Sequence, residues 1–69
     1  MKISARNVIK GTVKSIEMGA VNVELILEIA PGIEITSIIT KGSAESMGLE
    51  AGKEAYVIVK ASNVMVGVD

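Results

Sequence analysis

The sequence predicts an all-β domain with one short helix, folded as a small barrel of five strands that associates into an oligomer. The strictly alternating run from Val21 to Ile29 and the β-branched run from Ile33 to Thr40 are typical of paired strands. The chain has 69 residues, of which 49% are hydrophobic, and this suits one folded domain. Because it contains no Cys and no His, a disulfide or a zinc site cannot stabilise so small a core. Oligomerisation is the remaining means of stabilisation.

The first strand is expected over residues 3–17. Val13, Ser15 and Glu17 fall on one face of this strand if the alternation is regular. Gly11 interrupts the run, and a glycine in a strand relieves curvature or permits a bulge.

The second and third strands form the clearest pair. A turn at Met18-Gly19-Ala20 leads into Val21–Ile29, whose odd positions are all apolar and whose even positions are mostly polar, so one face is buried. Pro31-Gly32 is a turn signal, because proline fixes φ and glycine accepts a positive φ. The third strand is expected over Ile33–Thr40, where isoleucine and threonine favour a pleated surface.

A short helix is expected over Ser43–Leu49. Ser43 is a suitable N-cap, since its hydroxyl can accept from an amide of the first turn. Gly48 is a suitable C-terminal stop, and Ala51-Gly52 indicates a further turn.

The last two strands are expected at Ala55–Lys60 and Asn63–Val68. Five strands and one helix in so few residues favour a small curved barrel of the oligonucleotide/oligosaccharide-binding (OB) type. A flat sheet with a helix on one face is the competing architecture. Both of these strands are apolar on both faces, whereas a barrel has only one interior. The outward apolar face therefore predicts contact between subunits, or else an exposed patch.

Composition excludes several functions. The net charge is −1, from 7 basic and 8 acidic side chains, and Tyr56 is the sole aromatic residue, so neither a basic face nor a stacking platform for nucleic acid is expected. No apolar run is long enough to span a membrane or to form a signal peptide, and the lack of Cys fits a cytoplasmic protein. No nucleophile–base pair is possible without His or Cys, and the acids are scattered, so neither an enzyme nor a directly ligated metal is expected.

Three polar clusters carry the functional signal: Ser4-Ala5-Arg6-Asn7, Thr40-Lys41-Gly42-Ser43 and Lys60-Ala61-Ser62. They offer cations, hydroxyls and backbone amides, and none contains a carboxylate. A fully deprotonated tetrahedral oxyanion only accepts hydrogen bonds, so a site with donors alone suits it. Each cluster also has a purely structural interpretation: solvated charges at strand ends, a helix cap, or polar residues in the breaks between strands.

The whole chain resembles the molbindins, a family of small molybdate- and tungstate-binding proteins. The resemblance covers nearly all 69 residues and rests on an ordered set of short segments. These segments are Ser4-Ala5-Arg6-Asn7, Lys10-Gly11, Gly19-Ala20-Val21-Asn22, Ile39-Thr40 to Ser43, Met47-Gly48-Leu49, Gly52-Lys53-Glu54 and Lys60-Ala61-Ser62.

The resemblance implies a five-stranded OB-type barrel, assembly as a hexamer built from dimers, and oxyanions bound at subunit interfaces. It implies a single molybdate-binding domain over residues 1–69. It also implies two kinds of site. The first would take Ser4, Ala5 and Arg6 with Lys60, Ala61 and Ser62, and a neighbouring subunit would add Thr40 to Ser43. The second, nearer the symmetry axis, would involve Ala20, Val21 and Asn22.

The function implied is intracellular molybdate or tungstate storage or homeostasis. An oxyanion-sensing regulatory module that acts through a protein partner is the alternative. A pterin-binding function is a third interpretation, disfavoured because Tyr56 alone offers a ring for stacking.

Overall fold

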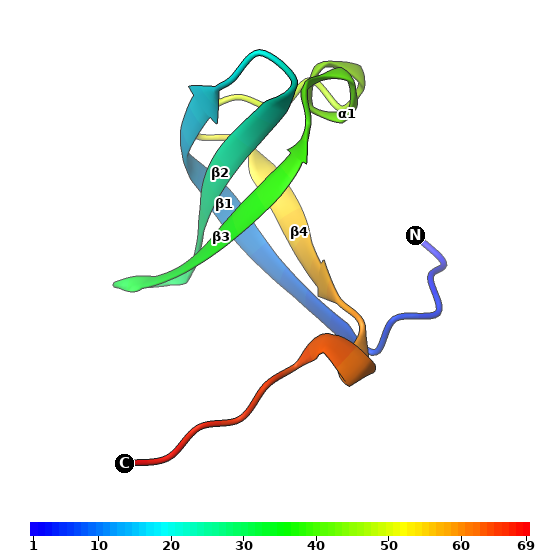
Figure 1. The fold of residues 1–69 in the computed structure, drawn as a ribbon, viewed down its shortest axis with the longest axis vertical. Helices are drawn as coiled ribbons and strands as arrows, with labels where there is room; N and C mark the ends of the chain where they lie inside the picture. Colours follow the sequence, from blue (N-terminus) through cyan, green and yellow to red (C-terminus); the bar gives the residue numbers. More distant parts are fainter.

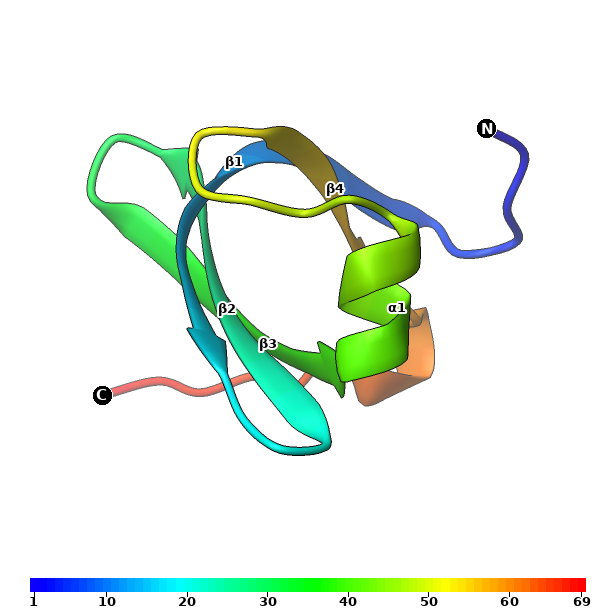
Figure 2. The same cartoon turned by 90° about the horizontal axis from the view of Figure 1, so that it is seen from above.

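The structure is a computed structural model that describes residues 1–69. Four strands form one antiparallel sheet in the order β3-β2-β1-β4, and the sheet curls around a single interior (Figures 1 and 2). The competing flat sheet is thus excluded, and the predicted mostly-β fold with one short α-helix is confirmed. In chain order the elements are β1 (Asn7–Met18), β2 (Asn22–Ala30), β3 (Ile33–Thr40), α1 (Lys41–Ser46), β4 (Glu54–Val59) and the short 3₁₀ helix η1 (Ala61–Asn63).

The core lies inside the curl and is built mainly from β2. The alternation predicted for β2 is confirmed, because Val23, Leu25 and Leu27 are all buried. Val13 of β1 and Val57 of β4 extend this core along the sheet, and Ala44 of α1 covers one end of it; these six residues form the buried cluster.

β1 is irregular, and this changes the faces of its side chains. Its pairing with β2 shifts between Val13 and Ser15, so the residues after this irregularity change phase. Ile16 is therefore half-buried while Ser15 and Glu17 are exposed, and the expectation that these two share the face of Val13 is wrong. β1 also begins at Asn7, not at residue 3, because its partner β4 ends opposite it at Val59.

The tight turns form where the sequence places them. Gly32 has φ +75° and closes the two-residue β2–β3 connection after Pro31. Gly52 has φ +90° within the turn that leads into β4. In both places the backbone uses the left-handed region that glycine adopts without steric cost.

α1 begins earlier than expected. Its N-cap is Thr40, whose Oγ1 accepts from the Ser43 amide at 3.1 Å, so the prediction of Ser43 as the cap is wrong. The reason is that β3 runs directly into the helix, which leaves its last threonine at the junction. The helix end is as predicted: Gly48 has φ +61°, and its amide and that of Leu49 donate to Glu45 and Ala44, which is a Schellman motif.

The predicted fifth strand is absent from the sheet. Residues 64–69 are extended but hydrogen-bond to no neighbouring strand, and the sheet stays open between β3 and β4. A β-strand is defined by hydrogen bonds to a neighbouring strand. This segment makes none, since it leads away from the sheet of its own chain (Figure 1). None of the helices has the length and apolar character needed to cross a lipid bilayer.

Candidate functional site

The start of β1 and the end of β4 bring two of the three polar clusters together. Asn7 pairs with Val59 in the antiparallel register, and its side-chain amide donates to the Val59 carbonyl at 3.2 Å. The residues just outside this pair therefore face each other across the end of the sheet. Ser4, Ala5, Arg6, Lys60, Ala61 and Ser62, with Ile3, Ile58 and Asn63, line a hollow of about 790 Å³.

This hollow, here called the terminal hollow, contains only hydrogen-bond donors and neutral groups among its side chains. Arg6 and Lys60 supply the positive charge, Ser4 and Ser62 supply hydroxyls, and no carboxylate lines it. Its polar side chains are solvent-exposed in the single chain. An anion held there by one chain would remain in contact with water, which weakens each charge interaction.

The third cluster lies at the opposite end of the molecule, beside α1 (Figure 1). Here Thr40 Oγ1 donates to Ser43 Oγ at 2.8 Å and accepts from the Ser43 amide. The Lys41 amide donates to the Val21 carbonyl at 2.8 Å. Backbone amides were expected as donors in this cluster, and this is wrong for the Ser43 amide, because the helix cap already uses its N–H. One chain does not bring this cluster to the terminal hollow.

The turn at Ala20, Val21 and Asn22 lies against this third cluster. Asn22 pairs with Thr40, and Val21 accepts the hydrogen bond from Lys41. These two segments, which the resemblance assigns to different kinds of site, are thus neighbours in the structure, and this proximity was not predicted. The sequence could have indicated this proximity, because a two-residue turn at Pro31-Gly32 fixes the hairpin register. Counting back from the turn places the start of β2 opposite the end of β3.

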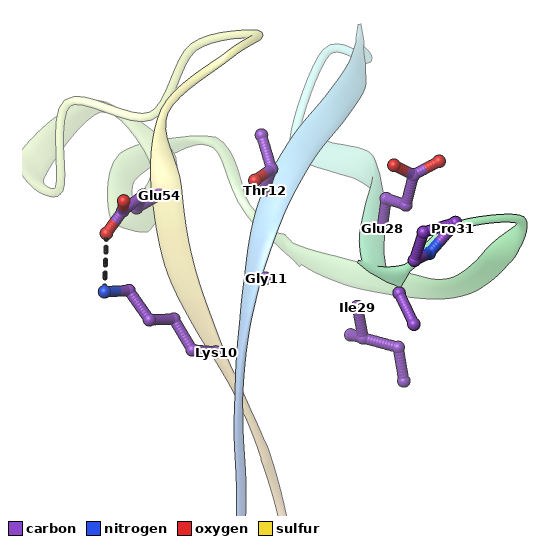
Figure 3. Close-up of a pocket in the computed structure, with 8 residues that line it drawn as sticks. Lys10, Gly11, Thr12, Glu28, Ile29, Pro31 and Glu54 are labelled. Carbon is purple, nitrogen blue, oxygen red and sulfur yellow. Dashed lines mark ion pairs between the residues drawn. The ribbon is translucent and has the colours of Figure 1, made fainter.

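A second polar hollow, of about 350 Å³, lies on the sheet between β1 and its two neighbours (Figure 3). Glu28 and Glu54 line it, and Lys10 donates across it to Glu54 at 3.0 Å. The carboxylates would repel a fully deprotonated oxyanion, so this hollow does not suit the same ligand. No group of three or more His, Cys, Asp or Glu residues is placed to hold a metal ion.

Two surface lysines have perturbed protonation. Hydrogen bonding to Glu54 and then charge attraction raise the pKa of Lys10 above its usual 10.5, and Glu34 does the same for Lys14. A lysine whose pKa is raised in the folded state stabilises the fold at pH values below 10.5. This contribution is lost as the pH rises through the raised pKa. Both pairs therefore stay intact throughout the neutral range.

Comparison with known proteins places this chain in a family. A family model described as the TOBE domain matches residues 3–66, and the chain belongs to the TOBE-domain family. A curated relative from Haemophilus influenzae, named "Probable molybdenum-pterin-binding protein", is 49% identical over 69 residues and matches along the full length of both chains. The resemblance to small molybdate-binding proteins is thereby confirmed.

Solved structures agree with this assignment. MopII from Clostridium pasteurianum superposes with a TM-score of 0.90 at 45% identity, covering 97% of this chain and all of that one. ModG, described as a cytoplasmic molybdate-binding protein and solved with molybdate bound, superposes with a TM-score of 0.93 at 49% identity. That match covers all of this chain and 49% of ModG.

Proposed function

We propose that this chain binds molybdate or tungstate at sites between subunits of a homo-oligomer, and that it serves intracellular storage or homeostasis of the oxyanion. The terminal hollow carries the proposal, because it gathers Arg6 and Lys60 with two serines and excludes carboxylates. The relatives' names and the molybdate in ModG support the same ligand class.

The chemistry of the terminal hollow discriminates by protonation. Molybdate near neutral pH is a dianion whose four oxygens accept hydrogen bonds and donate none. Arg6 and Lys60 match its charge, and the hydroxyls of Ser4 and Ser62 rotate to donate. The amides of Ala61 and Ser62, at the start of η1, are further donors without acceptors in the chain. An anion that still carries a proton would find no carboxylate to receive it.

A complete site needs a second subunit. The terminal hollow is open, while Thr40 and Ser43 lie at the other end of their own chain. A neighbour that brings its Thr40–Ser43 segment over the hollow would exclude water and add the Gly42 amide and the hydroxyl of Ser43. The turn at Ala20, Val21 and Asn22 would form the second kind of site, and a hexamer built from dimers would supply both.

In this proposal residues 1–69 act as a single binding domain, located in the cytoplasm, without catalytic activity. The terminal hollow holds groups that suit retention of an anion, and it contains no His, Cys, Asp or Glu that could serve as a general base or activate a serine hydroxyl. Neither nucleic acid nor membrane is needed as a partner.

Native mass spectrometry with molybdate, and separately with sulfate, tests this function. We expect discrete molybdate adducts on an oligomer, with far weaker sulfate adducts because sulfate is smaller. Arg6→Gln and Lys60→Met should each weaken molybdate binding about 10- to 100-fold, since each removes a charge-assisted hydrogen bond. Lys10→Met is the matched control, because Lys10 pairs with Glu54 outside the terminal hollow. Unchanged affinity in both hollow variants would refute the site.

A further inference from the structure

Arg6 and Lys60, the two cations of the terminal hollow, each lie one residue beyond the sheet. β1 begins at Asn7 and β4 ends at Val59, and these two residues form the last pair between the strands. No backbone hydrogen bond involves residues 1–6, and none joins Lys60 to β1. The hydrogen bonds of the sheet therefore do not fix where Arg6 lies relative to Lys60.

The two cations repel one another when no anion lies between them. The register that pairs Asn7 with Val59 would place Arg6 opposite Lys60 at the next position along the strands. Like charges in opposite positions of two strands are destabilising, and no carboxylate lines the terminal hollow to offset them. Because the ends of strands open most readily, this repulsion acts where the pairing of β1 with β4 is weakest.

The side chain of Asn7 links the two strands at this end. Its Nδ2 donates to the Val59 carbonyl oxygen at 3.2 Å and joins positions 52 residues apart in the chain. Asn7 is half-buried and does not line the terminal hollow. The other side-chain link between β1 and β4 is the exposed Lys10–Glu54 ion pair, which lies toward the opposite end of this strand pair. The Asn7 amide is thus the one side-chain bond placed to hold the two ends that carry the cations.

We propose that Asn7 is a positioning residue for oxyanion binding, an inference that rests on the function proposed above. Its amide holds the ends of β1 and β4 together against the repulsion between Arg6 and Lys60, so both cations line the terminal hollow before the anion arrives. A site that is ordered in advance loses less binding free energy to ordering when the ligand enters. Asn7 does not itself touch the anion.

An amide suits this role because it donates to the carbonyl without carrying a charge. A carboxylate of the same shape could not donate to the Val59 carbonyl, and it would place a negative charge beside the cations. A lysine or arginine would donate, but it would add a third positive charge to strand ends that already repel. A neutral donor therefore links the strand ends without changing the charge around the terminal hollow.

Calorimetric titration of the full chain with molybdate tests this role. Asn7→Leu keeps the approximate size of the side chain and removes the donor. We expect it to bind molybdate about 3- to 10-fold more weakly, which is the range for loss of one neutral hydrogen bond. Lys10→Met is the matched control, since it removes the other side-chain link between β1 and β4, and it should bind as the parent does. If Asn7→Leu aggregates, Asn7→Ala takes its place, because it adds no apolar surface.

A double-mutant cycle with Lys60→Met separates positioning from a general loss of stability. Once the charge of Lys60 is removed, it no longer repels Arg6, and the Asn7 amide has less repulsion to oppose. We therefore expect Asn7→Leu to weaken molybdate binding by less than about twofold in the Lys60→Met background. Equal losses in the parent and in this background would show that Asn7 acts only through stability, and would overturn the proposal.

Hydrogen exchange of the ligand-free protein measures the link between the strand ends independently of molybdate. We expect the amides of residues 7–9 and 57–59 to exchange about 3- to 10-fold faster in Asn7→Leu, and those of β2 to be unchanged. Unchanged exchange at these residues, or parent-like molybdate affinity of Asn7→Leu, would overturn the positioning role and leave the oxyanion site standing. A parent protein that binds no molybdate would instead overturn the proposed function, and the positioning role with it.

Discussion

At Gly11 the backbone of β1 approaches β2 more closely than any side chain allows. A Cβ added there would lie 2.8 Å from the Glu28 carbonyl oxygen, which is a backbone atom and cannot move alone. We expect Gly11→Ala to destabilise the fold by about 1–3 kcal/mol through this overlap. Urea unfolding of the ligand-free protein measures the effect.

Gly42→Ala is the matched control for this substitution. No heavy atom lies within 4 Å of the Cβ position at Gly42, and this residue is within α1. Alanine in a helix is favoured over glycine, so we expect the control to gain up to about 1 kcal/mol. Equal effects of the two substitutions would show that the close approach at Gly11 does not constrain the sheet.

At the scale of an element, the junction of β3 and α1 gives Thr40 two roles that can be separated. Its hydroxyl caps the helix through the Ser43 amide and orients the Ser43 hydroxyl. Thr40→Val keeps the shape and removes the cap, so we expect a loss of about 1 kcal/mol in unfolding free energy. Thr40→Ser retains a hydroxyl and should restore most of that stability. If Thr40→Val is as stable as the parent in thermal unfolding, the cap is not stabilising.

Local patterns in the sequence were sufficient to predict most helices, strands and turns. They failed where the structure depends on how one strand pairs with another. The alternation of β2, the turn at Pro31-Gly32 and the helix stop at Gly48 each depend on a few adjacent residues, and each was predicted. The phase change in β1 depends on how Val13 and Ser15 meet β2, which alternation along β1 alone does not encode. For the same reason the cap was assigned to Ser43 when the adjoining strand places Thr40 there.

On the scale of the whole molecule, an oligomer was predicted because the chain is too small for a large core and has strands that are apolar on both faces. The structure has the same two features. The buried hydrophobic core contains only six residues, while large apolar side chains such as Met65 and Val66 are exposed. The fifth strand was predicted from its composition alone, whereas a strand also needs a hydrogen-bonded neighbour, and residues 64–69 pair with no strand of the sheet. The grouping of the two terminal clusters, in contrast, was implied by the resemblance to the molbindins, and in the structure the antiparallel pairing of β1 with β4 brings those residues together.

Ligand and assembly should stabilise one another if the oxyanion sites lie between subunits. A ligand that binds only the assembled form stabilises it by mass action, by about 2.7 kcal/mol per site at 100 times its Kd. We therefore expect the unfolding midpoint to rise with molybdate concentration and, at fixed molybdate, with protein concentration. Sulfate at equal ionic strength is the control, and Arg6→Gln should remove most of the molybdate effect. A molybdate-induced shift that does not depend on protein concentration would place the site within one subunit and contradict the interface model.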